Sequence, residues 1–248
     1  YRKAEDFHGT IDVPVLGTIP RNNIAQGRHR LLITLQEPES LITEQYRILY
    51  SKLSQLIKGN PQSIFAISSS IKGEGKTISS LNLAVVMARD FGKKILLIEG
   101  DFRNPCIARY LQLKPQTGMI DILLNNADFQ SSVLTFAVEN LSILPVVKSV
   151  QNSSSVLSSQ EMIMLISMLK EKYDFILIDC PPILSLPDMN IIEKLVDGIL
   201  LVIRAERIPR DAVKTALNSL GTDKIVGVIL NDAKQPSSQY YHYLDRTA

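Results

Sequence analysis

The stretch SSSIKGEGKT, residues 68–77, decides the fold of this 248-residue chain. It closes an apolar run, IFAISS at 64–69, and opens a segment with helical spacing, Lys76–Arg89. Strand, loop and helix in this order are the setting in which a glycine-rich loop binds phosphate. Gly73 and Gly75 let successive backbone N–H groups face phosphate oxygens, and the helix adds its positive end. The stretch therefore predicts a phosphate-binding loop.

The side chains of this loop indicate a nucleoside triphosphate. We expect Lys76 to neutralise charge on the β- and γ-phosphates and the Thr77 hydroxyl to bind Mg²⁺. The common form of the loop has glycine where this chain has Ser70. The alternative is a glycine-containing turn that carries an incidental lysine. We expect ATP to contact eight residues: Ser70, Lys72, Gly73, Glu74, Gly75, Lys76, Thr77 and Ile78.

The chain between Phe65 and Leu230 repeats one rhythm, in which a short apolar run is followed by a turn and a helical stretch. Such alternation predicts a parallel sheet, and the unbroken apolar runs indicate that helices cover both of its faces. We expect a three-layer α/β P-loop NTPase fold with a mainly parallel central sheet, in a single core domain at 61–234. Besides 64–69, strands are predicted at 94–99, 141–147, 175–179, 198–203 and 224–230, and a second helix at Gln160–Lys172.

Three segments flank this core. Residues 38–60 predict a helix, Pro38–Lys58, whose apolar face carries Ile42, Tyr46, Leu49, Leu53 and Leu56. Residues 1–37 are broken by prolines and glycines and predict an irregular or extended connector. Residues 235–248 are polar and predict a mobile tail. That tail holds a cluster of three tyrosines at Tyr240, Tyr241 and Tyr243.

Composition limits the classes of function. The formal net charge of +2 is too small to indicate a nucleic-acid partner. The two cysteines predict no disulfide framework, and the three histidines show no metal spacing. Because no run approaches the roughly 18 to 20 apolar residues of a membrane helix, we expect the chain as given to be soluble. Its start at Tyr1 suggests a fragment.

Carboxylates follow two of the predicted strands. Glu99 and Asp101 end KILLIEGD, and Asp179 ends FILID. Ligands of open α/β sheets lie at the carboxyl ends of the strands, so we expect these acids beside the phosphate loop, although helix caps or turns would also use them. Asp179 is expected on the Mg²⁺ side, acting through water, and Asp101 is expected to orient or deprotonate an attacking hydroxyl. Arg103 either clamps a phosphate or pairs with Asp101. The candidate catalytic residues are Lys76, Glu99, Asp101, Arg103 and Asp179, and the candidate metal ligands are Thr77, Asp101 and Asp179.

These motifs resemble those of the bacterial tyrosine kinases, the P-loop autokinases of capsule and exopolysaccharide machinery. SSSIKGEGKT resembles their Walker A loop, ILLIEGDFRNP their Walker A′ segment and FILIDCPP their Walker B strand. DVPVLGTIP is similar to the stretch that follows the second transmembrane helix in fused members. The tail resembles their C-terminal tyrosine cluster, the target of autophosphorylation between neighbouring subunits.

The resemblance implies an ATP- and Mg²⁺-dependent protein-tyrosine autokinase that regulates polymerisation and export of a polysaccharide. Its implied partners are other copies of itself, a transmembrane polysaccharide co-polymerase in the same or a partner chain, and a cognate tyrosine phosphatase. Its implied location is the cytoplasmic side of the bacterial inner membrane.

Two residues depart from the family pattern. Glu99 stands where the family has a first aspartate, which would shift its hold on a metal-bound water. The family's oligomerisation motif appears here as EQYRILY, in which Glu44 and Arg47 match and Tyr50 replaces the second arginine. An arginine fork has no tyrosine equivalent, so ring assembly is the property that this change would affect.

Two other functions remain open. One is an assembly switch of the partition and septum-site ATPase type, which phosphorylates no tyrosine; its loop carries an extra lysine five positions before the main one, where this chain has Ile71. The other is a catalytically weak relative that uses ATP only to gate assembly of the polysaccharide machinery.

Overall fold

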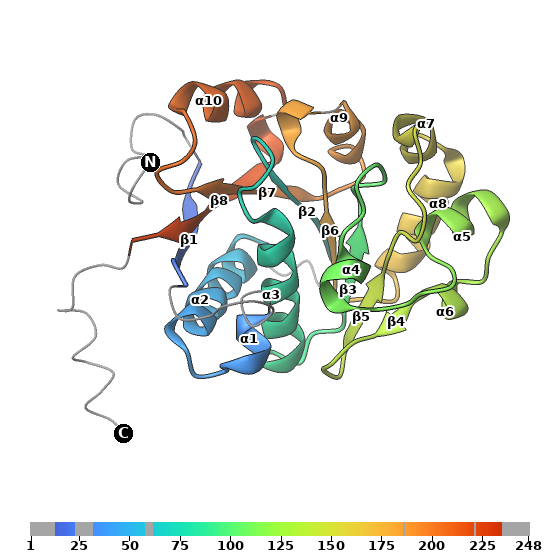
Figure 1. Ribbon diagram of the computed structural model, residues 1–248, viewed down its shortest axis with the longest axis horizontal. Coiled ribbons are helices and arrows are strands. Elements are labelled where there is room, and N and C mark those ends of the chain that lie inside the picture. The colour runs from blue at the N-terminus through green and yellow to red at the C-terminus, as the bar shows by residue number, and fades with distance from the viewer. Residues whose placement is uncertain (1–12, 23–31, 58–61, 186, 221, 235–248) are drawn as a thin grey trace.

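The computed structural model describes residues 13–22, 32–57, 62–185, 187–220 and 222–234. Its centre is an eight-stranded sheet with the strand order β1-β8-β7-β2-β6-β3-β5-β4 (Figure 1). Every neighbouring pair is parallel except β5 and β4, which are antiparallel. The strands are β1 Val15–Pro20, β2 Ser63–Ser69, β3 Ile95–Glu99, β4 Leu134–Thr135, β5 Leu141–Leu144, β6 Phe175–Asp179, β7 Gly198–Arg204 and β8 Ile225–Ala233.

Helices cover both faces of the sheet. One face packs against α1 Ile33–Gln36, α2 Leu41–Leu56, α3 Lys76–Arg89 and α4 Ile107–Leu111. The other packs against α5 Met119–Asn125, α7 Ser153–Leu157, α8 Gln160–Lys170, α9 Asp188–Ile192 and α10 Arg210–Asn218, with α6 Phe129–Ser132 beside them. Two short 3-10 helices lie at Ile183–Ser185 and Thr222–Lys224.

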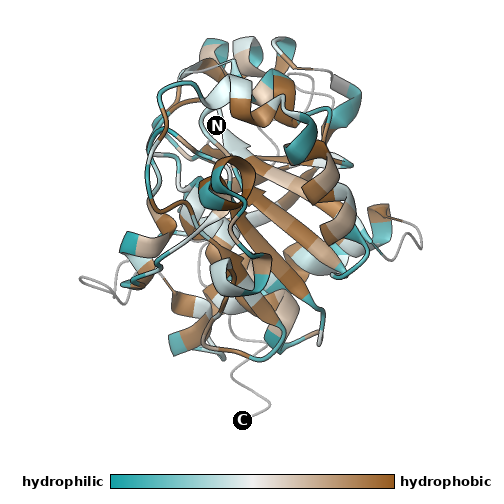
Figure 2. Cartoon of the chain, turned by 90° about the vertical axis from the view of Figure 1, so that its right-hand side faces the viewer, coloured by the Kyte–Doolittle hydropathy of each residue, from teal (hydrophilic) through white to brown (hydrophobic). Residues whose placement is uncertain are grey.

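The strands are apolar on both sides, as the unbroken runs predict. In β2, Phe65 and Ile67 face the α2–α3 layer, whereas Ile64 and Ala66 face the opposite core. Figure 2 shows the strands coloured hydrophobic along most of their length, between helices whose outer sides are more hydrophilic. The three-layer fold expected from the sequence is therefore confirmed.

The predicted elements of the core are confirmed with small changes at their ends. All six predicted strands are present, α3 has the expected bounds, and α8 ends at Lys170 rather than Lys172. The expected helix Pro38–Lys58 is α2, which begins after Ser40 because the Ser40 hydroxyl accepts the Thr43 N–H at 3.3 Å. Leu56, expected on the apolar face, is 49% exposed, and Tyr50 is buried instead.

The connector expected over 1–37 is part of the sheet at residues 15–20. There β1 pairs with β8 as an edge strand and buries Leu16 and Ile19. Pro20 is tolerated because an edge strand leaves one row of backbone groups unpaired. Within the described ranges, no helix has the length and apolar character that crossing a membrane requires.

Candidate active site

The loop between β2 and α3 needs glycine at position 75 for two reasons. Gly73 and Gly75 have φ angles of 91° and 97°, in the left-handed region that favours glycine. A Cβ atom on Gly75 would also lie 2.1 Å from the Asn231 side-chain nitrogen, whereas one on Gly73 would meet nothing within 4 Å. The loop is thereby held against the end of β8, and its N–H groups lead into the N-terminus of α3.

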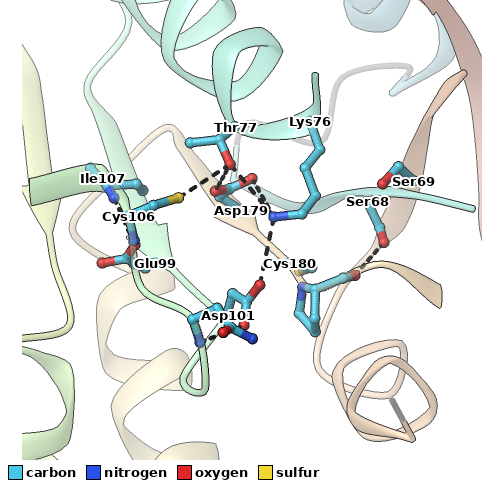
Figure 3. A network of polar contacts seen from close by, with 12 residues as sticks. Ser68, Ser69, Lys76, Thr77, Glu99, Asp101, Cys106, Ile107, Asp179 and Cys180 are labelled. Atoms are coloured by element: carbon cyan, nitrogen blue, oxygen red, sulfur yellow. Dashed lines mark hydrogen bonds and ion pairs between the residues drawn. The ribbon is translucent and has the colours of Figure 1, made fainter. Parts of the chain in front are cut away.

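Lys76 extends from the first residue of α3 to a position between two strand ends. Its Nζ lies 3.8 Å from Asp101 Oδ2 and 3.9 Å from Asp179 Oδ1 (Figure 3). Burial lowers the pKa of Lys76, but the two carboxylates outweigh it, so that the net shift is upward. The ammonium group is therefore held charged at the point where the loop meets both acids.

Asp179 is buried at the end of β6 and is satisfied by hydroxyl groups of α3. Its Oδ2 accepts a hydrogen bond from Thr77 Oγ1 at 2.6 Å, and its Oδ1 accepts one from Ser80 at 3.3 Å. Burial raises the pKa of Asp179, and Lys76 and Thr77 offset part of that rise. Carboxylate and hydroxyl oxygens are the ligands Mg²⁺ prefers.

The donor set at this point fits Mg²⁺ of the kind that nucleotide sites hold. The described residues contain no group of three or more histidine, cysteine or acidic side chains that could hold a metal by themselves. Mg²⁺ in such sites uses one or two protein oxygens and completes its shell with water and substrate phosphates. Thr77 and Asp179 provide such a pair, whereas Asp101 lies across from them beside Lys76.

Glu99 and Asp101 have different surroundings although only one residue separates them. Asp101 Oδ1 accepts the Asn104 N–H at 3.0 Å, and its other oxygen faces Lys76. Glu99 is fully buried and accepts the backbone N–H groups of Cys106 and of Ile107, the latter at 2.8 Å (Figure 3). It also accepts the Val146 N–H at 3.0 Å. Burial raises the pKa of Glu99, and these donors lower it in part. Glu99 therefore braces the loop that carries Asp101.

Arg103 does not pair with Asp101, which was one of its two expected roles. Its Nε donates to Ser153 Oγ at 2.8 Å and lies 4.0 Å from Asp188 Oδ2. Ser153 begins α7 and Asp188 begins α9, so these partners come from segments far along the chain. The sequence offered no spacing that connects the three residues.

The strand ends on the other side of the loop contain residues that the sequence analysis missed. Asn231 Nδ2 donates to the Glu74 carbonyl oxygen at 2.8 Å, and the backbone N–H of Arg204 donates to Glu74 Oε1 at 3.2 Å. The Arg204 guanidinium bonds to the Gly73 carbonyl oxygen and pairs with Asp232 at 2.8 Å. The rule that pointed to Asp179, polar residues at carboxyl ends of parallel strands, also applies to Asn231 and Asp232.

Two pockets meet at the loop. The first, here the Lys76 pocket, has a volume of about 480 Å³ and is lined by residues that include Lys72, Lys76, Thr77, Asp101 and Arg103. The second, the Asn231 pocket, has a volume of about 190 Å³. Both pockets are lined by Gly73, Gly75 and Ile78, so they lie on either side of the same loop. Of the remaining expected contacts, Ser70 is buried beneath the loop and accepts the Leu184 N–H on its carbonyl oxygen.

Comparison with known proteins identifies the family. A family model described as an AAA domain matches residues 62–223. The chain is 31% identical over 225 residues to a tyrosine-protein kinase of Bacillus subtilis, a match that covers 90% of this chain and 94% of the relative. The chain belongs to the bacterial tyrosine-protein kinase family.

One solved structure and one longer relative are also similar to this chain. The crystal structure of the chimerical protein CapA2B2 has a TM-score of 0.85 and 28% identity, and the match covers 94% of this chain and 100% of that one. The succinoglycan biosynthesis transport protein ExoP of Rhizobium meliloti is 30% identical over 204 residues, 80% of this chain. That match covers 26% of ExoP, so the kinase chain spans about a quarter of this relative but nearly all of the Bacillus one.

The predicted oligomerisation residues of this kinase lie on α2. Arg47 donates to Glu44 at 3.0 Å and to Asp90 at 2.8 Å. Tyr50 is 5% exposed, and its ring centroid lies 4.4 Å from that of Phe91 and 6.0 Å from that of Phe175. Oligomerisation stays a prediction, and Tyr50 belongs to the core. The three tail tyrosines, Tyr240, Tyr241 and Tyr243, lie outside the described residues.

Proposed function

We propose that this chain is an ATP- and Mg²⁺-dependent protein-tyrosine autokinase that phosphorylates Tyr240, Tyr241 and Tyr243. The observation that carries the proposal is the position of the Lys76 ammonium between Asp101 and Asp179, beside Thr77, on the wall of the Lys76 pocket. A cation and two acids at strand ends beside a glycine-rich loop are what phosphoryl transfer requires.

The two pockets suggest how ATP lies across the loop. The Lys76 pocket holds the charged groups and is proposed for the phosphates. The Asn231 pocket is lined by apolar residues that include Ile19, Ile33 and Ile42 and by polar residues that include Asn82, Arg204, Asn231 and Asp232, and it is proposed for the base. Because Gly73, Gly75 and Ile78 border both pockets, one nucleotide can extend over the loop from one pocket into the other.

The chain's own residues would prepare the transfer in three ways. The loop N–H groups and Lys76 hold the β- and γ-phosphates, and positive charge at that point stabilises the negative charge of the transition state. Thr77 and Asp179 would hold Mg²⁺. When bound, the ion would neutralise negative charge on the phosphate oxygens and so reduce their repulsion of the attacking hydroxyl. Asp101, tied to Lys76 and to the Asn104 N–H, is the group positioned to orient the acceptor hydroxyl.

The reaction would join a tyrosine oxygen to the γ-phosphorus as the bond from that phosphorus to the bridging oxygen of ADP breaks. The phenol proton leaves in the same process, and Asp101 is the proposed acceptor because its carboxylate lines the pocket. The protein forms no covalent bond to the phosphoryl group in this reaction, so positioning of the reactants and stabilisation of charge account for the rate.

The biological setting is proposed from the relatives. The name of ExoP concerns succinoglycan biosynthesis and transport, and most of its length lies outside the match. We propose that this chain likewise acts with a transmembrane polysaccharide co-polymerase, in the same or a partner chain, on the cytoplasmic face of the membrane. Other copies of the chain and a tyrosine phosphatase complete the proposed partners, and the controlled process is export of an exopolysaccharide.

The test is peptide mapping by mass spectrometry after the purified chain has been incubated with ATP and Mg²⁺. Phosphate on the tail tyrosines, absent from a Lys76→Met variant, is the expected result. ATP hydrolysis without phosphotyrosine would instead support the assembly switch, which uses the same loop. No hydrolysis and no phosphotyrosine, with nucleotide still bound, would support the catalytically weak relative.

A further inference from the structure

We propose that Asp188 and Ser153 are positioning residues that aim the Arg103 guanidinium at the terminal phosphate of the nucleotide. The inference rests on the proposed function only in taking the ligand of the Lys76 pocket to be a nucleoside triphosphate. It concerns a buried carboxylate and a hydroxyl that the mechanism above leaves unused.

The contacts fix the direction of every hydrogen bond in this chain of groups. An arginine can only donate, so Ser153 Oγ accepts from Arg103 Nε at 2.8 Å. The single hydroxyl proton of Ser153 therefore goes to Asp188 Oδ2, at 2.6 Å. Asp188 Oδ1 accepts the Ser154 hydroxyl at 2.7 Å, so both carboxylate oxygens are satisfied. Asp188 thus orients Ser153, and Ser153 holds the Arg103 guanidinium at its Nε edge.

Burial makes this arrangement rigid at one end and open at the other. Asp188 is 1% exposed and Ser153 is fully buried, whereas the Arg103 side chain is 34% exposed and lines the Lys76 pocket. Within the described residues, Arg103 makes its side-chain hydrogen bond through Nε, to Ser153. Its two terminal nitrogens make none there. A guanidinium fixed through Nε presents its remaining N–H groups to an anion with little loss of side-chain entropy.

The position of Arg103 indicates which phosphate of the nucleotide it would contact. The base end of the nucleotide is assigned to the Asn231 pocket, which shares Gly73, Gly75 and Ile78 with the Lys76 pocket. Arg103 lines only the Lys76 pocket, on the segment after β3 that also carries Asp101. The phosphate farthest from the base is therefore the one that Arg103 faces.

The structure offers a matched pair of serines for the test. Ser153 and Ser154 are neighbours in α7 and both donate to Asp188, but only Ser153 contacts Arg103. Loss of either hydroxyl removes one hydrogen bond from the same buried carboxylate. Only the Ser153→Ala change disconnects the guanidinium, so the pair separates positioning from general support of the fold.

The experiment is calorimetric titration of the full chain and its variants with two ligands, Mg²⁺–ADP and the Mg²⁺ complex of the non-hydrolysable β,γ-imido analogue of ATP. We expect Arg103→Gln and Ser153→Ala to weaken binding of the analogue about tenfold, the worth of one charge-assisted hydrogen bond, and to change ADP binding by less than about twofold. Ser154→Ala is expected to leave both affinities unchanged.

Three results would overturn the proposal: equal weakening of both ligands by Ser153→Ala, no weakening of either, or the same selective loss in Ser154→Ala. The readout needs no tyrosine phosphorylation. If the wild-type chain binds the analogue with the expected dependence on Ser153 but forms no phosphotyrosine, the proposed function fails and this inference stands. If Ser153→Ala has no selective effect while the tail is phosphorylated, this inference fails and the proposed function stands.

Discussion

Two buried glutamates, Glu74 and Glu99, hold loops of the site through backbone N–H groups. Glu74 accepts from Ile71 at 2.8 Å and from Arg204 at 3.2 Å, which ties the phosphate loop to β7. Glu99 ties the segment after β3 to the end of β5. Neither contact involves a side-chain cation, so it is backbone N–H groups that offset part of the cost of burying each acid.

Glu74 makes the stability of the unliganded chain depend on pH. Burial raises its pKa from 4.5 to about 7, against backbone donors that lower it. Because the folded pKa is the higher one, its contribution is fully present below pH 4.5 and is lost as the pH rises through about 7. We expect the free energy of unfolding of wild type, relative to Glu74→Gln, to fall over this interval and to level off above it. Denaturant titrations of both proteins between pH 4.5 and about 7 measure this difference in free energy of unfolding. A difference that does not change with pH would contradict the raised pKa of Glu74.

Glu99→Asp is expected to damage this chain although aspartate is the family's residue here. Aspartate is one methylene shorter and cannot reach the N–H groups of Cys106, Ile107 and Val146 together, and each buried N–H left unpaired costs about 1–3 kcal/mol. Glu99→Gln keeps the length and one acceptor, so we expect it to be the milder change in both melting temperature and phosphorylation rate. If instead Glu99→Gln abolishes transfer and Glu99→Asp does not, the charge of Glu99 acts in catalysis.

At the residue scale, the sequence predicted the groups that follow a local rule. Lys76 and Thr77 come from the loop motif, and Asp101 and Asp179 from the ends of apolar runs. The partners of Arg103 were not predictable, because Ser153 and Asp188 come from two short helices far along the chain. Asn231 and Asp232 follow the same strand-end rule at the end of β8.

At the scale of elements, α2 shows the surroundings of Tyr50, the residue that departs from the expected oligomerisation motif. The helix buries Tyr46, Leu49, Tyr50 and Leu53 against the sheet and α3. The Tyr50 ring fills the space between Phe91 and Phe175, so this position faces the core rather than a neighbouring subunit. Tyr50 therefore has a packing role within the chain.

Tyr50→Arg is consequently expected to destabilise the fold by about 3 kcal/mol, through loss of a buried aromatic ring and burial of a charge. Ile48→Arg is the matched control, since Ile48 lies on the same helix but is 36% exposed. The measurement is the free energy of unfolding in denaturant. Equal stability of the two variants would show that position 50 has no packing role.

The edge strand β1 shows the limit of sequence reasoning at this scale. Pro14, Gly17 and Pro20 indicate an irregular segment, and local propensity gives no reason to place it in a sheet. Burial of Leu16 and Ile19 and pairing with β8 decide its conformation. Tertiary contacts therefore override the local signal, as they do for many strands.

At the scale of the whole molecule, the parallel sheet places the last strand and the phosphate loop at one edge. The last strand, β8, is parallel to both of its neighbours, β1 and β7, and Asn231 near its end contacts the loop at Glu74. The tyrosine segment follows directly at 235–248. The fold was predictable because the apolar runs of the core were unbroken and helical stretches alternated with them.

A mixing experiment tests the central claim, that this site phosphorylates these tyrosines. One chain carries Lys76→Met and keeps its three tail tyrosines; the other keeps Lys76 and has Tyr240, Tyr241 and Tyr243 all changed to Phe. With ATP and Mg²⁺, we expect neither chain to gain phosphotyrosine alone and the Lys76→Met chain to gain it in the mixture. Absence of phosphate from the mixture, while the wild-type chain labels its tail, would show that transfer occurs within one subunit. Absence from wild type as well would contradict the account.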